Sequence, residues 1–465
     1  MWGVLRWFAF PVVVVLLAAA CAGSESETTS TPGASPTPFP TLSPTDALAP
    51  TTTPFPTITP QPRVIKEPLA LNRIAYIGSD NALYTINPDG SDRKRLTAGA
   101  TNGSADGGSG FSSYFWPTWS PDNRKLAVSQ VTTAPSLGVD SSIFSVATET
   151  GDSTWLFEAP FGSTEFISAE VPHYLYWSPD STQLAFLALS DGSFDLYLSP
   201  AGLPDASQAV ISGSPLYLAW TGDSRNLLLH LSDGLFVHDV DTAQGPSPLA
   251  PRSITFRVPA WALGDTAISY IVRASHGFNV LMLSDPDGGN AREIADVGER
   301  SAFLWSPNSD RVAIADAVDP TTLHFESLRI IDPVTGDSLL LAQERILAFL
   351  WSPDASKIAY VAFDPAGDRL SWKIADPATG EVRKLVDFLP SNDLFVYLLF
   401  FDQYAYSNSL WSPDSRQLTM SGLVLLTEDD GTGVAPGDQV YVLDVEGIEA
   451  PSAIAAGSLA SWSWD

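Results

Sequence analysis

The sequence predicts an all-β protein, a β-propeller, that follows a secretion signal and a long flexible stalk. Three observations support this prediction. A tryptophan-containing motif recurs from residue 119 to the C-terminus, short β-type runs and tight turns lie between its copies, and residues 1–66 contain neither pattern. A chain of 465 residues has room for a signal, a linker and one large β domain.

The motif is Trp-Ser-Pro-Asp or a close variant, followed by an aliphatic run. In the first copy, residues 119–122, the tryptophan is a bulky anchor, the proline fixes one φ angle, and the Ser and Asp side chains satisfy nearby amides. The run that follows is β-branched or aliphatic, as a buried strand requires. Each copy therefore predicts a strand, a tight turn and a second strand. The eight anchors are Trp119, Trp177, Trp220, Trp261, Trp305, Trp351, Trp411 and Trp462.

The spacing of the anchors favours a propeller over a stacked solenoid. The intervals are 58, 43, 41, 44, 46, 60 and 51 residues, and four-stranded units at roughly such spacings are typical of blades. A solenoid would need capping repeats and a more constant period. We predict a third strand that ends at an Asp-Gly or Thr-Gly turn, as at residues 87–90, and a short fourth strand. Eight anchors predict eight blades, or seven if one of the looser copies at Trp220 and Trp261 is not a blade.

The two ends of the repeat region complement each other. Residues 73–77, 83–84 and 95–97 read as second, third and fourth strands with no tryptophan strand before them, whereas residues 460–463 supply such a strand. We expect the N- and C-terminal strands to pair in one blade, because this pairing removes the open sheet edges.

The WSPD motif, the Lys/Arg/Gln-aliphatic-Ala/Thr strand and the x-Pro-Asp-Gly turn together resemble the repeat of the TolB-like β-propeller family. The resemblance covers roughly residues 70–465 and implies the propeller fold. It implies less about function, because this repeat occurs in partner-binding periplasmic proteins and as an accessory domain of peptidases.

Residues 1–21 have the design of a secretory signal. Arg6 precedes an apolar run, and three alanines lead into Cys21. The run is short for a membrane span, so a retained anchor is the weaker alternative. The resemblance to a bacterial lipobox, with Ala18 in place of the usual leucine, implies that Cys21 is lipidated and becomes the mature N-terminus. Cys21 is the only cysteine, which excludes disulfides and favours lipidation over an accidental cysteine.

Residues 22–66 consist mostly of Ser, Thr, Pro and Ala. Such a segment has too few large apolar groups to fold, so we expect a disordered linker. Residues 67–465 form the predicted propeller. Signal, linker and propeller together predict an extracytoplasmic lipoprotein, at the cell surface or in the periplasm, that contacts the membrane only through its lipid.

Composition and motifs exclude several functions. Acidic residues outnumber basic ones 53 to 24, for a net charge of -29, which disfavours nucleic acid and anionic lipid as partners. The plain alternative to a cationic partner or a metal is that this charge only keeps the protein soluble. The sequence lacks the G-x-S-x-G motif of propeller-bearing peptidases and the H-E-x-x-H metal motif. The acidic loop at Asp429 and Asp430 is a weak candidate Ca²⁺ site, the alternative being a solvated loop, and no other cofactor is expected.

Extra residues interrupt the regular spacing at 98–114, 131–141, 159–173 and 395–406. All four insertions fall in connections expected on one face, in neighbouring blades. Aromatic loops on a rigid scaffold are typical of binding surfaces; the alternative is that these loops cover the channel or pack on one another. The candidate binding residues are Tyr114, Phe115, Trp116, Tyr404 and Tyr406.

We therefore predict a monomeric, non-enzymatic scaffold that holds a protein or glycan partner at the cell surface. The alternative is a glycan hydrolase or lyase with its site at the central channel. If the candidate aromatic residues form an exposed binding surface, alanine at Tyr114, Trp116, Tyr404 and Tyr406 removes binding and leaves thermal stability nearly unchanged.

Overall fold

The computed structural model of the protein describes nine stretches of the chain. They are residues 69–99, 111–134, 138–162, 173–190, 193–242, 244–254, 258–275, 277–425 and 437–464. Cys21, the linker, and the candidate calcium ligands Asp429 and Asp430 lie outside these residues.

Four sheets of four antiparallel strands follow one another along the chain. The first contains β4 (Phe111–Trp119), β5 (Lys125–Ala134), β6 (Gly138–Ala147) and β7 (Ser153–Gly162). The second contains β8 (His173–Trp177), β9 (Gln183–Ser190), β10 (Ser193–Pro200) and β11 (Gln208–Gly213). The third contains β12 (Leu216–Trp220), β13 (Asn226–Leu231), β14 (Gly234–Asp239) and β15 (Ser247–Arg252). The fourth contains β16 (Ala260–Ala262), β17 (Ala267–Arg273), β18 (Asn279–Ser284) and β19 (Arg292–Val297).

The other thirteen strands form one continuous sheet. Its first part contains β20 (Arg300–Trp305), β21 (Val312–Ala317), β22 (Phe325–Ile331), β23 (Ser338–Trp351), β24 (Ile358–Phe363), β25 (Leu370–Ala375) and β26 (Val382–Pro390). The remainder contains β27 (Gln417–Leu425), β28 (Gln439–Asp444), β29 (Ser452–Trp462), β1 (Ile74–Gly78), β2 (Leu83–Ile86) and β3 (Lys94–Arg95). The sheet is continuous because three long strands each join one group of strands to the next. β23 pairs with β22 and β24, β26 pairs with β25 and β27, and β29 pairs with β28 and β1. In the last of these pairings, Ile74 of β1 lies opposite Trp462 of β29.

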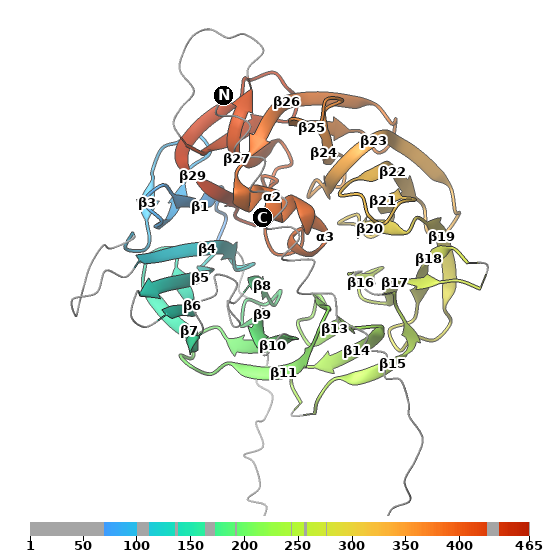
Figure 1. Ribbon diagram of the computed structural model, residues 1–465, viewed down its shortest axis with the longest axis horizontal. Helices are drawn as coiled ribbons and strands as arrows, with labels where there is room; N and C mark the ends of the chain where they lie inside the picture. Colours follow the sequence, from blue (N-terminus) through green and yellow to red (C-terminus); the bar gives the residue numbers. More distant parts are fainter. Residues whose placement is uncertain are drawn as a thin grey trace, which may run out of the picture. The chain divides into compact units, whose positions relative to one another are not determined.

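The sheets stand around a common centre (Figure 1). This arrangement is a β-propeller and confirms the all-β prediction. Two helices, α2 (Asn392–Leu399) and α3 (Phe401–Tyr404), lie near the centre of the ring.

Each WSPD segment forms the tight turn that its residues predict. In the first copy, the Asn123 N–H donates to the Ser120 carbonyl at 2.8 Å, and the Ser120 hydroxyl donates to Asp122 at 2.6 Å. Asn123 has φ 57°, a left-handed conformation that asparagine tolerates better than most residues. We call the end of the sheets that carries these turns the turn face. The opposite end, where second and third strands are joined and the chain passes between sheets, is the loop face.

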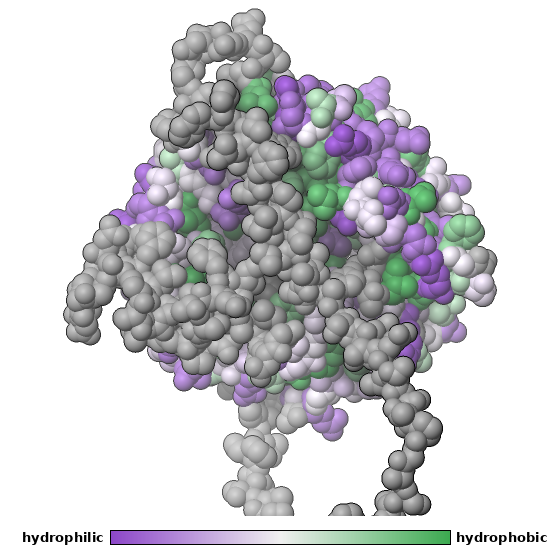
Figure 2. All heavy atoms as spheres, viewed as in Figure 1, coloured by the Kyte–Doolittle hydropathy of each residue, from purple (hydrophilic) through white to green (hydrophobic). Residues whose placement is uncertain are grey.

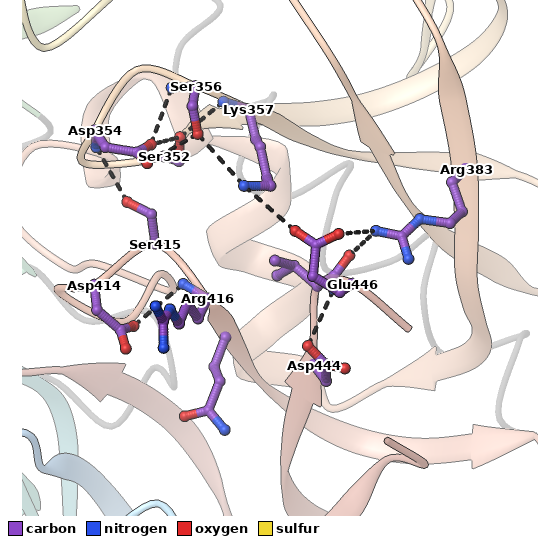
Figure 3. Close-up of polar contacts among 12 residues, drawn as sticks. Ser352, Asp354, Ser356, Lys357, Arg383, Asp414, Ser415, Arg416, Asp444 and Glu446 are labelled. Carbon is purple, nitrogen blue, oxygen red and sulfur yellow. Dashed lines mark hydrogen bonds and ion pairs between the residues drawn. The ribbon is translucent and has the colours of Figure 1, made fainter. Parts of the chain in front are cut away.

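Neighbouring turns are joined by a repeated hydrogen bond. The Asp122 N–H donates to the Ser181 hydroxyl of the next sheet, and the Asp180 N–H donates to Ser224, both at 2.9 Å. Figure 3 shows the equivalent bond from Asp354 to Ser415, at 3.1 Å. These serines occupy the left-handed position of their own turns. Ser181 and Ser224 therefore tie their own sheets to the preceding sheets, and Ser415 ties two neighbouring units within the thirteen-stranded sheet.

The anchor tryptophans form a second, deeper link between neighbouring four-strand units, both between sheets and within the thirteen-stranded sheet. Six indole Nε1–H groups donate, at 3.0–3.4 Å, to the carbonyl of the residue just before the preceding anchor. The pairs are Trp119 to Ser461, Trp177 to Thr118, Trp220 to Tyr176, Trp261 to Ala219, Trp351 to Leu304 and Trp411 to Leu350. Trp305 donates instead to the Ser269 hydroxyl, which donates to the carbonyl of Ala260. In the part of the chain that the structure describes, the buried indole N–H of Trp462 has no acceptor.

One anchor departs from the prediction that each begins on a strand. Trp411 makes only an isolated bridge with Leu418, and Ser409 makes another with Trp462. The preceding residues form α2 and α3, so the chain reaches this position from a helix and extends for too few residues to form a strand.

Replacing an anchor tryptophan by phenylalanine should lower the free energy of unfolding more where the indole N–H donates a hydrogen bond than where it does not. Trp177 donates to Thr118, whereas Trp462, equally buried, donates to nothing described. Trp177→Phe removes a buried hydrogen bond and leaves the Thr118 carbonyl short of a donor, whereas Trp462→Phe loses volume alone. We expect Trp177→Phe to lower the free energy of unfolding by about 1–2 kcal/mol more than Trp462→Phe. Denaturant unfolding of the full-length chain measures this difference, and equal losses would contradict the role of the indole bond.

The turn carboxylates should make stability depend on pH. Burial acts to raise the pKa of Asp354, but hydrogen bonds from Ser352, Ser356 and Ser415 hold this pKa at about 2, below its ordinary 3.8. Because the folded-state pKa is lowered, the stabilisation is present above about pH 4 and is lost as the pH falls toward 2. Asp354→Asn should therefore cost on the order of 1 kcal/mol at neutral pH, after allowance for solvent screening at this exposed side chain, and almost nothing near pH 2.

Unfolding midpoints measured across this pH range check the prediction. The exposed Asp205, in the turn before β11, provides the control variant Asp205→Asn. A loss for Asp354→Asn that does not change with pH would contradict the assignment.

Candidate functional site

The predicted aromatic insertion at 395–406 folds into helices instead of a loop. Ser391 caps α2, its hydroxyl accepting from the Leu394 N–H at 3.2 Å, and Asp393 lies in the first turn. Both features favour a helix start. Leu394, Tyr397 and Leu398 are buried, the spacing of one helix face. The local sequence therefore specifies a short helix with one apolar side.

Hydrogen bonds from distant strands hold α2 in place. The Ser391 hydroxyl lies 2.7 Å from that of Ser421 in β27, and the Ser458 hydroxyl of β29 donates to Asp393 at 2.7 Å. Burial raises the pKa of Asp393, and the bond from Ser458 opposes this rise. The Tyr397 hydroxyl donates to the Asn408 carbonyl at 2.9 Å. Because both ends of the segment are fixed, it behaves as part of the scaffold.

Aromatic rings from three elements meet beside α3. Trp116 of β4 stacks on Tyr404 with ring centres 4.4 Å apart and planes 4° apart. Tyr174 of β8 meets Tyr404 edge-on at 5.6 Å, and Tyr397 lies 5.7 Å from it. The Tyr174 hydroxyl donates to the Gln403 carbonyl at 3.2 Å. We call Trp116, Tyr174, Tyr397 and Tyr404 the aromatic cluster; it joins the inner strands to the helices near the ring centre (Figure 1).

Backbone bulges aim two of these side chains. Trp116 has φ 55° and Tyr174 has φ 52°, and Leu459 of β29 has φ 43°. Each stands three residues before its anchor, and the strand register shifts at each point. Positive φ is rare for bulky residues and is held in place by surrounding structure, while bulges re-aim side chains. The inner strands next to the helices are therefore distorted to meet them.

The structure brings only some of the predicted binding residues together. Trp116 and Tyr404 are in contact, and Tyr406 is half-buried with a buried hydroxyl. Tyr404 is only 4% exposed. The expectation of an exposed aromatic surface is therefore wrong for Tyr404, because the rings pack on one another.

The other two predicted residues lie elsewhere on β4. Tyr114 is half-buried and accepts a hydrogen bond from Gln130 at 3.1 Å. Phe115 is half-buried opposite Ser129. The sequence prediction missed Tyr174, although it stands at the same distance before its anchor as Trp116. Whether any of these residues binds a partner stays a prediction.

A cavity of about 480 Å³ opens on the sheet of β23–β26. Its lining contains four cationic side chains, three anionic ones, a serine, a phenylalanine and a proline. It extends to the loop face, since the connection between β24 and β25, residues 364–369, contributes to it. The lining is therefore dominated by charge.

Two pairs of opposite charges occupy the wall of this cavity. Lys373 contacts both oxygens of Glu344, at 2.8 and 2.6 Å, and the Tyr360 hydroxyl also donates to Glu344. Lys384 lies 3.0 Å from Asp387. Burial acts to raise the pKa of Asp387, but the hydrogen bonds from Ser371 and Lys384 lower it overall. Both carboxylates are matched by a cation.

The connection at the cavity rim holds a third carboxylate. Asp364 accepts from the backbone N–H groups of Gly367, Asp368 and Arg369. Burial acts to raise the pKa of Asp364, and these bonds outweigh burial and lower it. The Arg369 side chain lies 3.6 Å from Asp364 and 3.1 Å from Asp368, so this acidic turn is also matched.

Arg345 differs from the other cations of the cavity. Its guanidinium lies 5.0 Å from the ring centre of Phe363. Among the described residues, no carboxylate lies within 4.0 Å of it. The sequence contains a signal for this cavity that the prediction missed: residues 345–384 contain six of the chain's 24 basic residues.

Hydrophilic side chains cover most of the described outer part of the face in Figure 2, with apolar ones in small groups between them. The described ranges contain no group of three or more His, Cys, Asp or Glu side chains able to hold a metal ion. Within the same ranges, no helix has the length and apolar character needed to cross a bilayer. The charged cavity, of about 480 Å³, has the size of a small-ligand site.

Fold and cavity together define a β-propeller with a ligand-sized site at the edge of its loop face. No model of a known protein family matches the chain. No curated protein matches it either.

Solved structures similar to this chain include dihydro-heme d1 dehydrogenase NirN, at 14% identity and a TM-score of 0.50, over 88% of this chain and 78% of that one. They also include TolB from Acinetobacter baumannii, at 13% identity and a TM-score of 0.37, over 74% and 83%. A third is oligogalacturonate lyase from Vibrio parahaemolyticus, at 14% identity and a TM-score of 0.44, over 67% and 84%. At such identities a likeness concerns the fold alone.

The burial of Tyr404 changes the expected result of its substitution. Tyr404→Ala removes a buried ring that stacks on Trp116 and touches Tyr174, so we expect a loss of about 3–5 kcal/mol in the free energy of unfolding. Tyr404→Phe keeps the ring and should lose less than about 1 kcal/mol. Denaturant unfolding of the full-length variants distinguishes the two. A Tyr404→Ala protein as stable as the wild type would show that the cluster is not structural.

Proposed function

We propose that this chain is an extracytoplasmic lipoprotein whose propeller binds a glycan or protein partner without transforming it. The resemblance of Cys21 and its preceding alanines to a lipobox supports the lipid tether, and the Pro/Thr-rich stalk supports display away from the membrane. The resemblance of the repeat to the TolB-like family supports a location outside the cytoplasm.

The proposed ring has eight blades and is closed by the pairing of β29 with β1. Eight anchor tryptophans support this count, as do four separate sheets and a further sheet in which β23, β26 and β29 are each shared by two units. The Trp119 bond to Ser461 adds a contact across the junction.

The observation that carries the binding function is the charge state of the cavity. A general acid at neutral pH needs a raised pKa, whereas the pKa values of Asp364 and Asp387 are both lowered. Two described carboxylates with raised pKa values, Asp265 on the turn face and Asp393 on α2, do not share a site. Carboxylates that are hydrogen-bonded and stay ionised at neutral pH suit ligand recognition better than acid catalysis of hydrolysis or elimination.

The aromatic cluster supports the same choice. The alternative, a glycan hydrolase or lyase, was expected to act at the central channel. Rings and helices there pack closely, with Tyr397, Phe401 and Tyr404 buried. The cavity on β23–β26 is then the better place for a ligand, and its polar lining favours a glycan over an apolar segment of a protein.

Glycan binding without turnover tests the proposed function. The full-length protein, incubated with acidic and neutral polysaccharides, should retain a subset of them and release no new reducing ends or unsaturated sugars. Retention and product analysis are measured on the same samples. Turnover would establish the enzymatic alternative, and absence of any retention would overturn glycan binding.

The tether is checked in the same preparation. Cys21→Ser should move the protein from the membrane fraction to the soluble extracytoplasmic fraction while leaving polysaccharide retention unchanged. A variant that stays in the membrane fraction would overturn the lipid anchor.

A further inference from the structure

We propose that the cavity on β23–β26 recognises a saccharide through a carboxylate, and that Arg345 binds that carboxylate. This inference rests on the glycan-binding function proposed above and adds the chemical class of the ligand and the residue that selects it.

The balance of charge in the cavity leaves one cation for a ligand. Lys373 is engaged by both oxygens of Glu344, and Lys384 by Asp387. Arg369 lies against the acidic connection at the rim. Arg345 is the remaining cation of the lining, and no described carboxylate matches it. One unmatched cation among matched pairs calls for one negative charge on the ligand.

The residues around Arg345 position its guanidinium to bind an anion. It lies over Phe363 at 5.0 Å, within the range of a cation–π contact. Gly367, with φ 77°, lies beside it, and a Cβ at that position would fall 3.0 Å from the Arg345 Nη2 atom. Glycine at this position therefore avoids a close contact with the guanidinium. A planar guanidinium on a flat ring presents paired N–H groups, the arrangement that binds a carboxylate through two parallel bonds.

The charge pairs favour hydroxyl groups on the rest of the ligand. A hydroxyl both donates and accepts, so it can meet a carboxylate and an ammonium together at Glu344 and Lys373, and again at Asp387 and Lys384. Ser371, also in the lining, donates to Asp387 at 2.6 Å. An apolar ligand would desolvate these ions without replacing their hydrogen bonds. The lining therefore selects a polyhydroxylated molecule.

Size and overall charge narrow the ligand further. About 480 Å³ is within the usual range of small-ligand sites, roughly 300–1,000 Å³. A chain of net charge -29 repels a dense polyanion. A sugar acid, with a single carboxylate on a hydroxylated ring, satisfies the size, the hydroxyl pattern and the charge.

Three probes separate these contributions when they are titrated into the full-length protein by calorimetry: D-glucuronate, D-glucose and acetate. We expect glucuronate to bind at least about ten-fold more tightly than glucose, because glucose lacks the charge, and acetate to bind weakly, because it lacks the hydroxyls. Arg345→Gln should remove the preference for glucuronate. Because Arg345 is exposed, the thermal unfolding midpoint of the Arg345→Gln protein should match that of the wild type.

Arg252→Gln is the matched control. Arg252, on β15, is also exposed and pairs with Asp233 outside the cavity, so its loss should leave the preference intact.

Equal affinity for glucuronate and glucose, or an unchanged preference in Arg345→Gln, would overturn this inference and leave glycan binding intact. Loss of the preference in Arg252→Gln would show a long-range charge effect and would also overturn it. Absence of saccharide binding by the wild type, together with no polysaccharide retention, would overturn both this inference and the proposed function.

Discussion

Hydrogen bonds from the indole N–H groups of the anchor tryptophans set how neighbouring four-strand units meet. A buried N–H without an acceptor costs about 1–3 kcal/mol, so an anchor is stabilised where the preceding unit presents a carbonyl at the position just before its own anchor. Trp177 finds it at Thr118, and Trp220 finds it at Tyr176. Where Trp305 cannot reach Ala260 directly, the Ser269 hydroxyl bridges the two. The serine bonds between turns then repeat the same spacing nearer the turn face.

The one anchor without an acceptor identifies where the ring has been modified. By the pattern of the others, Trp462 would donate to Leu410, whose carbonyl instead accepts from the Thr419 N–H at 2.8 Å. Leu410 lies just after α2 and α3, in the segment that forms only isolated bridges. The inserted helices therefore cost this unit its inner strand and its indole bond. The bulge at Leu459 lies on β29, the inner strand of the following unit. Trp116, which lies at the bulge of β4 one unit further on, stacks on Tyr404 of α3.

Local sequence predicted the turns, the strands and the anchors, because the chemistry of a WSPD turn lies within a few consecutive residues. At 395–406 aromatic content favoured an exposed loop, with loops that pack on one another as the alternative; the segment is helical and Tyr404 is buried. The burial of these rings depends on Ser421 and Ser458, which bind α2 from strands distant in the sequence. It also missed the cavity, because Glu344 and Lys373 are 29 residues apart. That Arg345 lacks a carboxylate partner is a property of the folded sheet, which no local pattern encodes.

The proposed anion site lies in a protein of strongly negative net charge. Each carboxylate of its lining is matched at short range, so little of the net charge acts on the ligand directly. The lowered pKa values of Asp364 and Asp387 keep both groups ionised until the pH falls below their ordinary range. The partners of these carboxylates therefore stay engaged at neutral and mildly acidic pH. Over that range Arg345 remains the unmatched charge, and the cavity keeps one preference for an anion.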